Sequence, residues 1–129
     1  MGAEEAMSAA DVLSLRKDAE RGDADAQWFL GYCYEKGKGV AKDYTEAVKW
    51  YRKSAEQGYA EAQFDLGLCY AQGLGVPKDD VIAYMWYNLG AASGDEGAKH
   101  NRDTLEKKMT AEKIAEAQRL SREWKPRGE

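Results

Sequence analysis

Two short motifs place nucleophilic or cationic residues at spacings that enzymes use. Ser14-Leu15-Arg16-Lys17 has the Ser-x-x-Lys spacing of β-lactamases, which pairs a nucleophilic serine with a lysine. Gly37-Lys38-Gly39 is similar to part of a phosphate-binding loop. The Lys-Thr-Gly and Ser-Asp-Asn motifs that accompany the first pattern do not follow it, and neither Ser nor Thr follows the lysine of the second. We therefore interpret the first motif as a surface helix and the second as a turn.

The remaining reactive side chains also fail to form a catalytic set. His100 is the only histidine, which excludes a metal site built from several histidines, and no Gly-x-Ser-x-Gly elbow occurs. Aspartates and glutamates are plentiful, but they fall on the outside of predicted helices and at helix starts, where carboxylates are usually solvated. No pattern combines a nucleophile, a base and an oxyanion site. We therefore predict that the protein is not an enzyme and has no catalytic residues, metal site or cofactor.

Two cysteines, Cys33 and Cys69, allow two interpretations, because they occupy equivalent places in successive copies of a repeat. A disulfide requires Cα atoms within about 7 Å of each other. Equivalent positions in stacked helical repeats usually lie about 10 Å apart, because neighbouring helices pack at roughly 8–10 Å. We therefore favour small apolar core residues with free thiols, which fit a reducing compartment.

The elements that carry these residues follow a repeat of about 36 residues. Gly22 recurs at Gly58 and Gly94, and about half of the positions of the first copy match the second without a gap. A fixed period of this length is typical of solenoids, in which each unit buries its apolar face against the next. The matching pairs include Ala26/Ala62, Leu30/Leu66, Gly31/Gly67, Cys33/Cys69, Tyr34/Tyr70, Trp50/Trp86 and Tyr51/Tyr87.

Each full copy predicts two helices joined by a glycine-rich loop. In the first copy, Asp23 is a suitable N-cap for a helix over about residues 24–36. Asp43 and Glu46 have the spacing of a capping box for a second helix over about residues 44–57. The second copy repeats this plan, so the sequence predicts two helical hairpins in succession.

The two ends of the array are predicted to be caps. Residues 1–21 contain one helix with Ser8 as its N-cap, and this helix has Ser14 where the repeats have tryptophan, so one flank need not be buried. The third copy lacks the glycine loop, and Thr110 is a suitable cap for a last helix that ends near Trp124. We therefore predict one all-α domain with about seven helices. Its parts are an N-terminal capping helix in 1–21, repeats 22–57 and 58–93, and a degenerate C-terminal capping repeat 94–129.

The composition fits a soluble helical domain and excludes several partners. Apolar residues make up 43% and charged residues 33% of the 129 residues. The net charge of −4 and the pI of about 5.2 argue against nucleic acid and against an anionic membrane surface, since both require a basic face. No apolar run approaches the roughly 20 residues of a bilayer-spanning helix. Residues 1–10 carry no basic side chain and do not resemble a signal peptide, so we expect a cytoplasmic protein.

The repeated pattern resembles the Sel1-like repeat (SLR). It reads Ala-x-Ala-Gln-x-x-Leu-Gly-x-x-Tyr, then Gly-x-Gly-Val, then Ala-x-x-Trp-Tyr-x-x-Ala with a closing Gly, and it occurs at 24–58 and 60–94. The stretch from Met109 to Trp124 is similar to the usual ending of such arrays. This resemblance implies a right-handed α-α superhelix of antiparallel helix pairs, related to the tetratricopeptide repeat, that serves as an adaptor for protein partners.

The same resemblance implies an alternative function. A cysteine-rich branch of the family binds penicillin-type ligands and has weak β-lactamase activity, so a small-molecule binder or hydrolase of that kind is the second possibility. That branch pairs cysteines within each helix pair, whereas each repeat has a single cysteine here.

The resemblance also implies where a partner binds, because the first helix of each pair lines the concave side of such solenoids. The groove is expected to have an aromatic N-terminal end and a more polar, basic C-terminal end, which suits a peptide with an apolar anchor and an acidic residue. Trp28 and Phe64 are explained equally well as half-buried packing residues. With so few repeats we expect an interface below about 1,200 Å², a weak or transient protein complex, and a monomer. The predicted groove residues are Asp25, Trp28, Tyr32, Glu35, Glu61, Phe64, Leu68, Gln72, His100 and Thr104.

Overall fold

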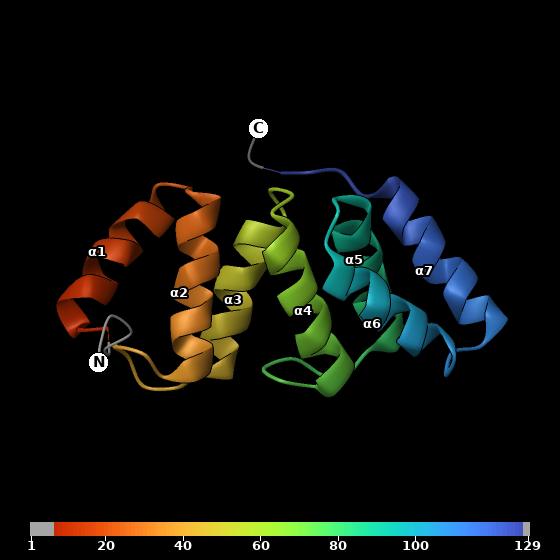
Figure 1. Cartoon of the computed structure of the whole chain (residues 1–129), viewed down its shortest axis with the longest axis horizontal. Coiled ribbons are helices and arrows are strands. Elements are labelled where there is room, and N and C mark those ends of the chain that lie inside the picture. Colours follow the sequence, from red (N-terminus) through yellow and green to blue (C-terminus); the bar gives the residue numbers. More distant parts are fainter. Residues whose placement is uncertain (1–6, 128–129) are drawn as a thin grey trace.

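Seven α-helices make up the computed structural model of the chain, which describes residues 7–127. They lie in a row from α1 at one end to α7 at the other, with α2 and α4 in front of α3 and α5 (Figure 1). The described residues contain no strand, and the prediction of an all-α array of about seven helices is confirmed. The helices are α1 (Ala9–Glu20), α2 (Ala24–Lys36), α3 (Tyr44–Ala55), α4 (Ala60–Gln72), α5 (Asp80–Ala92), α6 (Glu96–Glu106) and α7 (Ala111–Glu123).

In the described part of the chain, six of the seven helices begin at a polar side chain that accepts a backbone N–H of the first turn, and α4, which follows Tyr59, has no such bond. Ser8 Oγ accepts the N–H of Asp11 at 3.0 Å and the Asp11 carboxylate accepts the N–H of Ser8 at 3.1 Å, which completes a capping box. The capping box predicted at Asp43 and Glu46 forms only by half. Asp43 accepts the N–H of Glu46 at 3.1 Å, but the Glu46 carboxylate lies 3.7 Å from the ammonium of Lys49 one turn further on. The expectation was wrong in this detail because the lysine offers Glu46 a competing partner.

Aromatic side chains of the second helices fill the space between consecutive helix pairs. Trp50 and Trp86 are each 4% exposed, as their place in the repeat predicts. Gly67 has no side chain, which leaves room for the ring of Tyr87. A Cβ on Gly67 would lie 2.6 Å from Cδ1 of Tyr87. The same arrangement occurs one repeat earlier, so each pair packs around a tyrosine ring that lies directly on a glycine.

The two cysteines are buried and free. Burial raises the pKa of Cys69 to about 12, so its thiol stays protonated at neutral pH. Burial also raises the pKa of Cys33. The interpretation of both residues as apolar core side chains without a disulfide is confirmed.

Buried glutamines join each helix pair to the helix before it. Gln27 Nε2 donates a hydrogen bond to the carbonyl of Ala19 at 3.0 Å, and Gln63 Nε2 donates to the carbonyl of Ala55 at 3.2 Å. The two bonds are equivalent, one repeat apart. Each adds a second hydrogen bond to a carbonyl in the last turn of the preceding helix, which also accepts the N–H of the glycine three residues further on.

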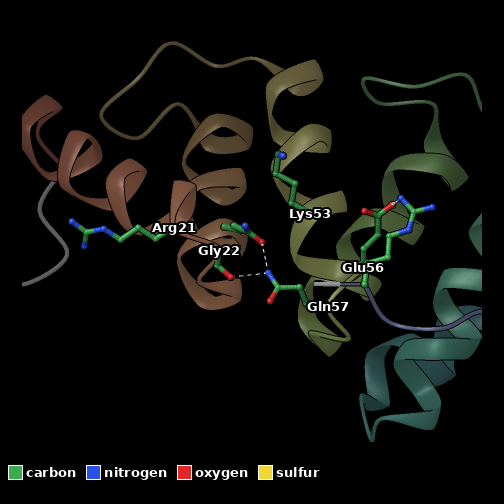
Figure 2. Close-up of a pocket in the computed structure, with 7 residues that line it drawn as sticks. Arg21, Gly22, Lys53, Glu56 and Gln57 are labelled. Carbon is green, nitrogen blue, oxygen red and sulfur yellow. Dashed lines mark hydrogen bonds and ion pairs between the residues drawn. The ribbon is translucent and has the colours of Figure 1, made fainter. Parts of the chain in front are cut away.

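The two copies of the repeat differ in whether the side-chain oxygen Oε1 of this glutamine accepts a hydrogen bond. Gln57 Nε2 donates to Oε1 of Gln27 at 2.8 Å and to the carbonyl of Gly22 at 2.9 Å (Figure 2). One repeat later Ser93 stands in place of Gln57. Oε1 of Gln63 is buried there and has no hydrogen-bond partner among residues 7–127. Since a buried acceptor without a donor costs about 1–3 kcal/mol, the second junction is less well satisfied than the first.

The segment after α7 runs back along the row of helices toward the ends of α3 and α4 (Figure 1). The Trp124 ring packs edge-on against Trp86, with 6.0 Å between ring centroids and 73° between ring planes. Further along, the N–H of Arg127 donates to the carbonyl of Glu56 at 2.6 Å, and the two side chains form an ion pair at 3.9 Å. The last described residues therefore connect the C-terminal helix to the end of α3.

Candidate peptide-binding face

The first helices of the pairs, α2, α4 and α6, form one side of the molecule, which we call the inner face. A hydrogen bond from Trp28 of α2 to Asp65 of α4, and direct contact between α4 and α6, link these three helices along this side. All ten predicted groove residues lie on these helices. Five of them are half-buried: Trp28, Tyr32, Glu35, Phe64 and Leu68. The other five are exposed: Asp25, Glu61, Gln72, His100 and Thr104.

Four aromatic side chains meet at the α2 end of the inner face, and we call Trp28, Phe29, Tyr32 and Tyr59 the aromatic cluster. The centroid of Trp28 lies 6.2 Å from that of Phe29, 6.0 Å from Tyr32 and 6.0 Å from Tyr59. Phe29 is 36% exposed, which is unusual for a ring of this size. Sequence reasoning missed Phe29 because the next copy has Asp65 there, and missed Tyr59 because it precedes α4 as an N-cap.

Asp65 lies beside the aromatic cluster and accepts a hydrogen bond from Trp28 Nε1 at 2.7 Å. Burial raises the pKa of Asp65 to about 6; the Trp28 hydrogen bond and Lys36 oppose the rise, while the charges of Glu35 and Asp95 add to it. The Lys36 ammonium pairs instead with Glu35, at 3.6 Å. A half-buried carboxyl with a pKa near neutrality is a candidate functional group. The repeat pattern does not indicate this group, since an aspartate in a helix is normally solvated.

Two of the predicted groove residues also hold helices together. Glu35 Oε1 accepts a hydrogen bond from the buried hydroxyl of Tyr51 at 2.5 Å, which joins α2 to α3. Burial is the largest cause that raises the pKa of Tyr51, so this phenol stays a donor at neutral pH. Phe64 packs against Tyr87, with 6.2 Å between ring centroids. Phe64 is therefore in part a packing residue, as the alternative interpretation has it, although its ring is only half-buried.

A small cavity opens at the other end of the inner face, between α4 and α6. It brings together three of the predicted residues, Leu68, Gln72 and Thr104, while His100 lies outside it. Its volume is about 230 Å³, below the roughly 300 Å³ at which small-molecule pockets begin. A single side chain of a partner is a better match for this size. The lining residues are Leu68, Ala71, Gln72, Tyr87, Asn101, Thr104, Leu105 and Lys108.

Another cavity, of about 340 Å³, lies away from the inner face, where α1 and α3 end (Figure 2). Three of its four charged side chains have ionic partners, since Arg21 lies 3.3 Å from Asp18 and Arg127 pairs with Glu56. The fourth, Lys53, has its ammonium 5.8 Å from the centre of the Trp50 ring. Gln57 is bonded across it to Gly22, at the start of the same repeat. We interpret this cavity as the junction between the first repeat and the C-terminal segment rather than as a ligand site.

The catalytic candidates of the sequence lie apart from both cavities. Ser14 and Lys17 are exposed on α1, which is the surface-helix placement that was predicted. Lys38 lies in the loop after α2, with its ammonium 5.8 Å from the centre of the Tyr32 ring. Within residues 7–127 no group of three or more His, Cys, Asp or Glu side chains is arranged to hold a metal ion. Over the same residues, no helix has both the length and the hydrophobicity needed to cross a bilayer.

Stacked helix pairs with equivalent contacts at each junction, and a continuous face lined by their first helices, define a helical-repeat solenoid. A family model described as the Sel1 repeat matches residues 24–59 and 60–95, and the chain belongs to this family. Sel1 repeats generally act as protein-interaction scaffolds and are typically not enzymes.

Solved structures with the same fold include two bacterial proteins. One is c5321, a protective antigen present in uropathogenic Escherichia coli strains that displays an SLR fold; it is 39% identical, with a TM-score of 0.87 over 90% of this chain and 25% of that chain. Another is a Sel1 repeat protein from Oxalobacter formigenes, 41% identical, with a TM-score of 0.71 over 73% of this chain and 39% of that chain. The chain therefore spans well under half the length of either structure. No curated protein matches it.

Proposed function

We infer that the chain is a protein-interaction module that holds a peptide segment of a partner along its inner face. The observation that carries this proposal is the concentration of incompletely buried apolar side chains on α2 and α4, next to a cavity sized for one side chain. A solenoid core needs only one side of each first helix, so Tyr32 and Phe29 have no need to lie at this surface for stability. Leu68 packs with one side against buried residues of α5 and α6 and adds its other side to this face. The family's general role as an interaction scaffold supports the same conclusion.

The size of the face predicts the strength of the complex. Three short helices offer less than the roughly 1,200 Å² of total buried surface that stable complexes start from, so the partner is held weakly or transiently. An extended segment that runs from the aromatic cluster to the cavity between α4 and α6 would contact all three first helices. Its apolar side chain would fill that cavity, and Lys108 at the cavity edge suits an acidic group beside it.

A paired capture experiment tests this function. The wild-type chain, a Tyr32→Ala/Leu68→Ala variant and a Leu13→Ala control are immobilised, and retained proteins are compared by quantitative mass spectrometry. Leu13 is the matched control because it is a large apolar residue of α1, 56% exposed and away from the inner face. We expect a partner that is lost from the double variant and kept by the control, with both variants folded by circular dichroism. A partner retained equally by all three chains would refute the use of the inner face.

A further inference from the structure

Asp65 has unused capacity to accept hydrogen bonds at the middle of the inner face. A carboxylate can accept about four hydrogen bonds, and the only side-chain bond to Asp65 among residues 7–127 comes from Trp28 Nε1. No lysine or arginine in this part of the chain forms an ion pair with it. The carboxylate is therefore half-buried, next to the aromatic cluster, and without a cationic partner.

The surroundings of Asp65 leave its negative charge uncompensated. The groups that face it are Glu35 and Lys36 from α2, Tyr51 from α3, Cys69 of its own helix, Tyr87 from α5 and Asp95 at the start of α6. Lys36 is the one cation among them, and its ammonium is paired with Glu35. The phenols and the thiol are neutral at pH 7, since burial raises their pKa values. Because Lys36 and Glu35 offset each other, Asp65 and Asp95 leave this part of the inner face with a net negative charge.

The other copies of the repeat show that the fold does not need this carboxylate. The position of Asp65 is held by Phe29 one repeat earlier and by Asn101 one repeat later. Asn101 places a neutral polar side chain beside Tyr87. An ionised side chain in a half-buried place is unfavourable for folding, so its presence in this copy alone points to a role in binding.

We propose that Asp65 and the Trp28 ring beside it form a subsite for a cationic side chain, arginine above all, of the peptide segment held on the inner face. This inference rests on the proposed function. A guanidinium can pair with a carboxylate through two N–H groups and at the same time stack on an aromatic ring, which lysine does less well. The exposed ring of Phe29 and the ring of Tyr32 then receive an apolar side chain next to the arginine. The partner is thus an arginine-containing segment with an adjacent apolar residue.

Selection from a phage-displayed library of random dodecapeptides on the folded full chain at pH 7.5 tests the proposal. We expect enriched peptides to carry arginine or lysine beside an apolar residue. Synthetic copies of these peptides are then titrated calorimetrically against the wild type, Asp65→Asn and a Glu116→Gln control, which removes one exposed carboxylate of α7. Affinity should fall about tenfold or more for Asp65→Asn, since a charge-assisted pair is lost, and by less than about twofold for the control.

A change of pH provides a second measurement on the wild type. At pH 5 a carboxyl with a pKa of about 6 is about 90% protonated, so binding should weaken by about tenfold relative to pH 7.5. The Asp65→Asn variant should lose this part of the pH dependence. A variant as pH-sensitive as the wild type would overturn the assignment to Asp65.

The possible failures distinguish the inference from the function on which it rests. Enriched peptides without a cationic residue, or peptides indifferent to Asp65→Asn but lost with Tyr32→Ala/Leu68→Ala, would overturn the arginine subsite and leave the peptide-binding face standing. A selection that enriches no sequence would overturn both. Self-association of the wild type that disappears in Asp65→Asn, measured by light scattering, would make a second copy of the chain the occupant and would also overturn the proposal.

Discussion

Replacing Asp65 by asparagine should stabilise the protein at neutral pH, although it removes a hydrogen-bonded side chain. The amide oxygen of asparagine can still accept the hydrogen bond from Trp28 Nε1, so the link between α2 and α4 is kept. What disappears is the cost of holding a charge in a half-buried place beside Asp95 and Glu35. Asn101 occupies the equivalent position one repeat later, so the backbone there accepts this side chain.

The size of the effect follows from the pKa. The pKa of Asp65 rises from its usual 3.8 to about 6, and each unit corresponds to about 1.4 kcal/mol, so the ionised carboxylate destabilises the fold by at most about 3 kcal/mol. Partial solvent access lowers this, and we expect a gain of about 1–3 kcal/mol for the variant at pH 7. Because the folded state holds this proton more tightly than the unfolded state, the penalty is absent below about pH 4. It grows as the pH rises and is complete above about pH 6.

Chemical denaturation of both chains at closely spaced pH values from 4 to 7.5 measures this effect. Other carboxylates titrate in the same range, so the quantity to read is the difference in unfolding free energy between the variant and the wild type. That difference should be small at pH 4 and rise to its full value near pH 7. A difference that does not depend on pH, or a variant less stable than the wild type at pH 7, would refute the account of Asp65 as a strained carboxylate.

Three further substitutions test the packing by the unfolding free energy in urea. Trp86→Ala should cost about 3–5 kcal/mol because it empties a buried aromatic site, and a loss below about 1 kcal/mol would contradict this. Gly67→Ala should cost about 1–3 kcal/mol, since the added methyl meets the ring of Tyr87 at 2.6 Å; a neutral result would show that the ring moves freely. Ser93→Gln should gain about 0.5–1.5 kcal/mol by giving Oε1 of Gln63 a donor, and no gain would imply that this oxygen is already satisfied.

The sequence was sufficient to predict what the copies of the repeat have in common. Residues that recur at the same place, such as Trp50 and Trp86, must meet equivalent neighbours, so their burial follows from the period alone. Helix starts were also predictable, because Ser8 and Thr110 act through backbone groups only three residues away. The ten predicted groove residues were placed on the correct helices because the helix boundaries follow from the repeat and its caps. Their role in binding is still a proposal.

The features that could not be predicted are those in which the copies differ. Phe29, Asp65 and Asn101 share one register but have unlike side chains, and only the stacked structure shows that Asp65 lies against Trp28. A pattern based on recurrence discards such positions as variable. The bond between Arg127 and Glu56 was equally out of reach, because it joins residues far apart in the sequence through a segment without regular structure.

The bond between Arg127 and Glu56 at the end of α3 affects how the protein unfolds. Arrays whose units touch only their nearest neighbours can lose their end units one at a time, because each step breaks a single interface. Here Trp124 and Arg127 reach back past the last unit, so the terminal helix cannot detach without also releasing contacts at Trp86 and Glu56. Unravelling from this end is therefore coupled to the middle of the array, and amide protons of α7 and of the end of α3 should exchange with solvent in the same opening event.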